Sequence, residues 1–123
     1  MQVFYDRHVC RRRPYPDYVQ RSFDFLGNSP AEVYNTMNGP SEFHVIGTIK
    51  DWDVRHRLGE IRVPTLVTSG RYDEATALIA GTVHQGIPGS RWVLFEHSSH
   101  MAHVEEEERY RQVLSEFIGQ HEG

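Results

Sequence analysis

Asp73 and His100 are the residues whose types and spacing best fit acid–base chemistry in this sequence. Imidazole titrates near neutral pH, so it can take a proton from a nucleophile and return it to a leaving group. A carboxylate beside it holds the ring in one tautomer and stabilises the imidazolium. Taken singly, Asp73 could be an ordinary loop or helix-capping aspartate, and His100 is one of eight histidines. The pairing is what predicts a catalytic role for them.

The elements predicted around these two residues explain why they should meet. The predicted order is strand, acidic loop, helix, strand and histidine-bearing loop, over residues 63–69, 70–74, 76–87, 91–96 and 97–103 in turn. Both strands are apolar on both faces, which is typical of a parallel sheet. Because parallel strands end at the same edge of a sheet, we expect Asp73 and His100 to lie side by side there.

This chain order is the one in which an α/β-hydrolase presents the last two members of a Ser–Asp–His triad. The predicted fold class is therefore α/β, as the C-terminal part of an α/β-hydrolase: a helical cap remnant, the last two parallel strands with their helices, and an incomplete sheet. The sequence contains no Gly-x-Ser-x-Gly nucleophile motif. The chain is therefore expected to be part of a hydrolase and to be inactive when isolated.

Two regions are predicted. Residues 1–60 read as short helices and linkers with no strand that could seed a sheet, which suits a helical cap, or lid, over an active site. Residues 61–123 are predicted to be the C-terminal portion of the hydrolase core. Two strands alone leave both sheet edges open, so further strands are expected from another chain or from residues upstream.

Several local sequence signals predict helices in these two regions. Helical patterns are expected over residues 1–13 and from Asp17 onward. Ser29 and Glu32 have the spacing of a capping box, with Pro30 at the first helical position. Residues 41–50 fit either an extended segment or a helical turn. A short helix is expected near residues 54–58, and a final helix is expected to begin in the acidic run 105–108, where carboxylates favour a helix N-terminus.

Composition narrows the class of protein. The chain has 123 residues, a formal net charge of −4 and a pI near 6.0, which argues against binding nucleic acid. Its single cysteine, Cys10, has no internal disulfide partner, and this fits a reducing compartment. No apolar stretch approaches the length of a membrane span. We therefore expect a soluble cytoplasmic protein that binds neither nucleic acid nor membrane.

A metal site is the alternative chemistry for the histidine-bearing loop. His97, His100 and His103 form an H-x-x-H-x-x-H series close to four glutamates. Helical ligand pairs prefer a spacing of four residues, and Ser98 and Ser99 favour a loop over a helix. The expectation is accordingly that no metal and no other cofactor is needed.

Three stretches together resemble the proline iminopeptidase (prolyl aminopeptidase) family of α/β-hydrolases. They are Tyr-Asn-Thr-Met-Asn-Gly-Pro-Ser-Glu-Phe at residues 34–43, Gly-Arg-Tyr-Asp-Glu-Ala-Thr at 70–76, and Phe-Glu-His-Ser-Ser-His-Met at 95–101. The first is fairly specific to this family, whereas many α/β-hydrolases share motifs like the other two. The family's His-Gly-Gly-Pro-Gly oxyanion-hole stretch and its nucleophile elbow are absent from the sequence.

The resemblance implies a role for each matching residue. Asp73 would be the triad acid and His100 the triad base, while Glu42 and Glu74 would grip the free amino terminus of a peptide. Tyr34 would lie near the same pocket. A peptide α-amino group is largely cationic at neutral pH, so paired carboxylates would select it. The implied substrate is a peptide with a free N-terminus, preferentially proline.

Two functional hypotheses follow from the sequence. In the first, the chain is the C-terminal fragment of a serine aminopeptidase, and a missing N-terminal half supplies the serine and the oxyanion hole. In the second, it is a non-catalytic peptide-binding or interaction module that kept a hydrolase-derived shape. Such a module could pair with another chain, or with a copy of itself, through the open sheet edge.

Overall fold

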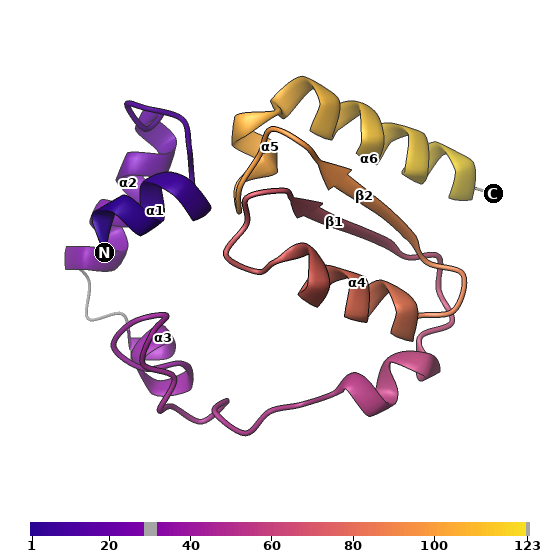
Figure 1. The fold of residues 1–123 in the computed structure, drawn as a ribbon, viewed down its shortest axis with the longest axis horizontal. Coiled ribbons are helices and arrows are strands. Elements are labelled where there is room, and N and C mark those ends of the chain that lie inside the picture. Colours follow the sequence, from indigo (N-terminus) through magenta and orange to yellow (C-terminus); the bar gives the residue numbers. More distant parts are fainter. Residues whose placement is uncertain (29–31, 123) are drawn as a thin grey trace. The chain divides into compact units, whose positions relative to one another are not determined.

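The computed structural model describes residues 1–28 and 32–122, which fall into two compact units (Figure 1). The sheet unit comprises Met1–Pro14 and Arg55–Gly123, and the helical unit comprises Tyr15–Val54. The predicted cap, residues 1–60, differs from the helical unit at both ends. At the first end, the chain at the end of the first helix hydrogen-bonds to the loops beyond the strands; at the second end, Leu58 lies close to Gly86 of the sheet unit.

The helical unit contains the short helices that its sequence predicts. Helix α2 spans Asp17–Asn28 and α3 spans Glu32–Met37. The Ser29 and Pro30 signals lie outside the described residues. Segment 41–50, which the sequence leaves open, forms turns with an isolated antiparallel bridge between Ser41 and His44. It folds back on α3, since the Asn38 carbonyl accepts hydrogen bonds from the backbone N–H groups of Ile46 and Gly47.

The sheet unit is built on two parallel strands in the described residues, β1 at Leu66–Gly70 and β2 at Arg91–Phe95. Their register pairs Leu66 with Arg91 and Gly70 with Phe95. Helix α4, Ala77–Gly86, connects them, so the predicted strand–helix–strand order is confirmed. Strand β1 begins at Leu66, later than the predicted start at residue 63. Pro64 cannot extend the strand hydrogen bonds toward the N-terminus, because it has no backbone N–H.

Helices cover both faces of this strand pair (Figure 1). On one face, Trp92 packs against Gly81 of α4 and donates a hydrogen bond to the Ser69 hydroxyl over 2.9 Å. On the other face, buried Phe95 packs with Ala102 and with Val113 from the last helix. The alternation of side chains along each strand thus gives a layer of helix, sheet and helix.

The remaining elements of the sheet unit are helical. They are α1 at Gln2–His8, the 3₁₀ helix η1 at Arg55–Glu60, α5 at Ala102–Glu105 and α6 at Glu107–His121. The sequence predicts one final helix from the acidic run, whereas the structure breaks it at Glu106, whose φ is −129°. Among the described residues, the structure has no helix with the length and apolar character that a membrane span requires.

Candidate active site

Two loops at the carboxyl ends of β1 and β2 form the candidate site. Backbone hydrogen bonds bind one loop to the other: the Arg71 N–H donates to the Phe95 carbonyl over 2.9 Å, and the Tyr72 N–H donates to the Ser98 carbonyl over 3.0 Å. The two loops are therefore held together at the edge of the sheet where α/β folds place their ligands.

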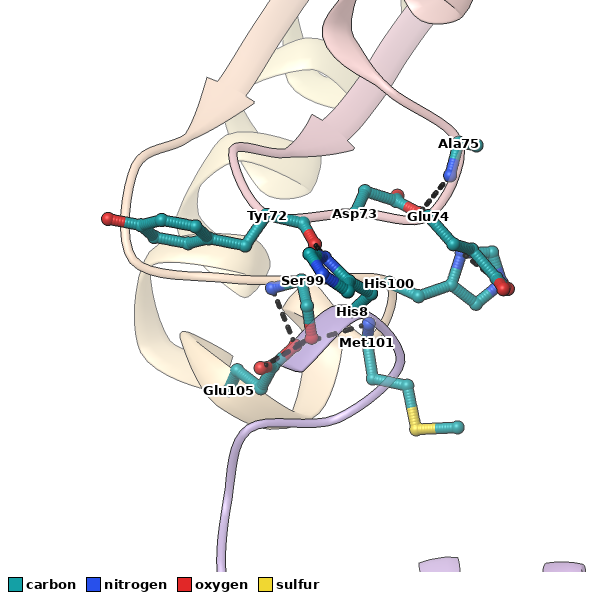
Figure 2. Close-up of polar contacts among 9 residues, drawn as sticks. All are labelled: His8, Tyr72, Asp73, Glu74, Ala75, Ser99, His100, Met101 and Glu105. Carbon is teal, nitrogen blue, oxygen red and sulfur yellow. Dashed lines mark hydrogen bonds and ion pairs between the residues drawn. The ribbon is translucent and has the colours of Figure 1, made fainter. Parts of the chain in front are cut away.

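The side chains of Asp73 and His100 contact each other between these two loops. His100 Nδ1 lies 2.9 Å from Asp73 Oδ1, and the same oxygen accepts a 2.9 Å hydrogen bond from the Ala75 N–H (Figure 2). Because a carboxylate only accepts hydrogen bonds, Nδ1 carries the proton in the neutral ring, and Nε2 carries the lone pair. The Asp73 side chain is 8% exposed and the His100 side chain 49%, so a sheltered carboxylate holds an imidazole that solvent reaches.

Glu74 adds a second carboxylate beside the pair. Its Oε1 lies 4.0 Å from His100 Nδ1, and its side chain is 20% exposed. Figure 2 shows Glu74 and the His100 ring next to each other. A partly sheltered carboxylate at this position could attract a cationic group brought to the histidine.

Helix α1 ends against both loops, a contact that sequence reasoning missed. The His8 carbonyl accepts hydrogen bonds from the Glu74 N–H at 3.2 Å and from the His100 N–H at 3.3 Å. His8 Nδ1 lies 2.8 Å from the Tyr72 carbonyl and must donate to it (Figure 2). His8 thus joins the loop that carries Asp73 (residues 71–76, the acid loop) to the loop that carries His100 (residues 96–101, the base loop), although no sequence signal links it to either.

Two glutamates, Glu105 and Glu106, hold the base loop in place through hydrogen bonds. From the sequence, they are expected only to stabilise the start of a helix. Ser98 and Ser99 are fully buried. The Ser98 hydroxyl donates to Glu106 Oε2 over 2.5 Å, and the Ser99 hydroxyl donates to Glu105 Oε1 over 2.8 Å. The sequence signal that could have predicted this anchoring is the pair of serines just before His100 together with the glutamate five residues after it.

The other predicted site residues lie in the helical unit. Tyr34 is in α3, and Glu42 lies between the bridged residues Ser41 and His44. Their roles toward a substrate stay predictions. Within the described part of the chain, no three His, Cys, Asp or Glu side chains are grouped so that they could hold a metal ion.

Cys10, two residues after the end of α1, is buried. Burial raises the pKa of the Cys10 thiol, and the negative charge of Glu105 raises it further. The thiol is therefore neutral at physiological pH, which suits packing and not nucleophilic attack.

Gly70 tests how closely the two loops must approach. A Cβ atom there would lie 2.0 Å from the Ser99 carbonyl oxygen and 2.6 Å from that of Ser98. We expect Gly70→Ala to push the loops apart and to lower the free energy of unfolding by at least about 1–3 kcal/mol. Urea unfolding of the two chains measures this difference.

Gly119→Ala is the matched control, because nothing lies within 4 Å of its added Cβ in helix α6. It should leave stability unchanged or raise it by up to about 1 kcal/mol. Equal unfolding midpoints for the two variants would contradict the close approach at Gly70.

Known proteins resemble the chain along nearly its whole length. No family model matches it. The proline iminopeptidase of Saccharolobus solfataricus is 50% identical over 120 residues, which are 98% of this chain and 38% of that protein. Two solved structures superpose with a TM-score of 0.90 over 98% of this chain and 40% of each neighbour: VinJ, at 46% identity, and the proline iminopeptidase of Mycobacterium smegmatis, at 42%.

The fold and the edge-of-sheet site define the class: the chain has the fold of the C-terminal part of an α/β-hydrolase. Within that class, over the part it spans, it belongs to the proline iminopeptidase family. The chain covers about two-fifths of the length of the relatives that it matches.

Proposed function

We propose that this chain supplies the acid and the general base of a serine exopeptidase that releases N-terminal residues, preferentially proline, from peptides. The observation that carries the proposal is the 2.9 Å contact between His100 Nδ1 and Asp73 Oδ1. The nucleophilic serine and the oxyanion hole would come from a hydrolase portion outside this sequence, docked along the open edge of the sheet.

The proton transfers follow from the tautomer of His100. Its Nε2 would take the proton of the serine hydroxyl as the oxygen attacks the peptide carbonyl. Asp73 would stabilise the resulting imidazolium through the Nδ1 proton. The imidazolium would then give the Nε2 proton to the leaving amine, and a water would be activated in the same way to release the acyl group.

Selection for a free N-terminus would come from carboxylates. Glu74, 4.0 Å from the catalytic imidazole, would bind the cationic α-amino group together with Glu42, and Tyr34 would line the same pocket. An α-amino group has a pKa near 8 and is mostly charged at neutral pH. A blocked or internal residue would lack this charge and would leave the carboxylates unsatisfied. We propose a cytoplasmic setting for this activity, in keeping with the lone cysteine.

A chimera tests the proposal. In it, this chain replaces the matched 120-residue segment of the Saccharolobus proline iminopeptidase. We expect the chimera to hydrolyse L-prolyl p-nitroanilide but not its N-acetyl derivative, and the isolated 123-residue chain to hydrolyse neither. A folded chimera that binds prolyl peptides without cleaving them would favour the non-catalytic binding module instead.

A further inference from the structure

The Glu105 carboxylate accepts several hydrogen bonds from the base loop, beyond any role at the start of a helix. Its Oε2 accepts from the Ser99 N–H at 3.0 Å and from the Met101 N–H at 3.2 Å, and the Ser99 hydroxyl reaches both oxygens, at 2.8 and 3.0 Å. The Arg11 N–H donates to Oε1 at 2.7 Å. These four donors use the whole acceptor capacity of an ionised carboxylate.

The two loop amides that Glu105 binds belong to the residues on either side of His100 (Figure 2). The His100 N–H itself donates to the His8 carbonyl, and the Met101 N–H also lies 3.1 Å from the Val9 carbonyl. The same carboxylate accepts from the Arg11 N–H and so holds the segment after α1 against the loop. The peptide groups around the histidine are therefore fixed on every side.

We propose that Glu105 is a positioning residue for His100: it fixes the backbone on both sides of the histidine so that the imidazole meets Asp73. Its relevance to catalysis rests on the proposed function, but the geometry does not. Glu105 touches neither the imidazole nor a reacting atom and acts only through the loop. A misplacement of a catalytic group by about 1 Å can lower the rate by on the order of a hundredfold, so such a residue matters for turnover.

Glu106 provides a matched control one residue away. Its carboxylate accepts from the His97 N–H at 3.1 Å and from the Ser98 hydroxyl at 2.5 Å, and it pairs with Arg109 at 3.5 Å. It thus anchors the start of the same loop with comparable bonds, but it does not contact the residues flanking His100. A merely structural role predicts the same result for Glu105→Gln and Glu106→Gln.

Amide hydrogen exchange of the full 123-residue chain, measured by NMR, is the first readout. A glutamine amide offers one acceptor oxygen where the carboxylate offers two, so Glu105→Gln must leave some donors unpaired. We expect exchange at Ser99 to accelerate on the order of tenfold or more in Glu105→Gln, and exchange at Met101 to accelerate less, because its N–H keeps the Val9 carbonyl. Both amides should stay near the parent rates in Glu106→Gln. Ser99→Ala, which removes only a hydroxyl donor, should give a smaller increase and serves if Glu105→Gln does not fold.

The second readout is the low-field proton signal of the hydrogen-bonded His100 Nδ1–H. It should weaken or vanish in Glu105→Gln and persist in Glu106→Gln. Unprotected Ser99 and Met101 amides in the parent chain would overturn the proposal, as would equal effects of the two glutamine variants or an unchanged imidazole signal in Glu105→Gln. Because neither readout involves peptide hydrolysis, an inactive chimera would refute the proposed function and leave this result intact.

Discussion

Replacing His100 by alanine in the chimera should abolish hydrolysis of L-prolyl p-nitroanilide, with a loss in kcat on the order of 10⁶-fold. The reason is that imidazole Nε2 is the proposed acceptor of the serine proton, and water cannot replace an oriented base. His97→Ala is the control, since His97 lies in the same loop, is exposed and anchors the loop only through its backbone N–H. Its rate should stay within about twofold of the parent rate, as expected for an exposed side chain outside the site.

Substitutions at Asp73 separate charge from contact in the same assay. Asp73→Ala removes the oxygen that accepts from both His100 and Ala75, and kcat should fall on the order of 10⁴-fold. Asp73→Asn loses the negative charge that stabilises the imidazolium, and its amide nitrogen can donate to Nδ1 and favour the wrong tautomer, so its loss should be of the same order. An asparagine variant much less impaired than the alanine variant would show that the orientation of the ring, and not the charge, carries the effect. Full activity in both variants would contradict the acid–base pair.

The second large effect is expected at Glu42. In the chimera, Glu42→Gln should lower kcat/KM for L-prolyl p-nitroanilide by about tenfold or more, because one charge-assisted contact is worth roughly 1.5–3 kcal/mol. Glu74→Gln should act similarly, with the loss concentrated on substrates that carry a free amino group. Steady-state kinetics at neutral pH measures both variants.

Glu32→Gln is the control for this prediction, because Glu32 is an exposed glutamate in α3 of the same helical unit as Glu42. It removes the same charge from the same unit, so a general electrostatic effect would appear in both variants. A Glu42→Gln enzyme with the kinetics of Glu32→Gln would mean that Glu42 does not recognise the amino group.

The strand, helix and strand around the site were predictable because their residues obey local rules. Apolar runs at β1 and β2, with a helical pattern between them, indicate a parallel unit, and a parallel unit sends both following loops to one edge. The meeting of Asp73 and His100 follows from that topology alone. The sequence therefore predicted the pair without any knowledge of the loop conformations.

The contacts that hold the Asp73 and His100 loops in place were not predictable in the same way. The His8 carbonyl and the Arg11 N–H make their bonds through backbone groups, which leave no pattern in side-chain identity, and the Arg11–Glu105 bond spans 94 positions. The acidic run was interpreted from its charge near a helix start, whereas Glu105 and Glu106 turn their carboxylates back into the base loop. The break between α5 and α6 lies at Glu106, and helical periodicity could not reveal it.

The protonation of the His100 ring gives the most direct test of the account, which depends on Asp73 orienting that ring. The measurement is ¹⁵N NMR of the 123-residue chain labelled in its histidines, with His8→Gln used to assign the signal of the His8 Nδ1–H. We expect neutral His100 to carry its proton on Nδ1, and Asp73→Ala to convert it to the mixture of tautomers found in free histidine. An unmodified chain in which His100 already shows that mixture would contradict it.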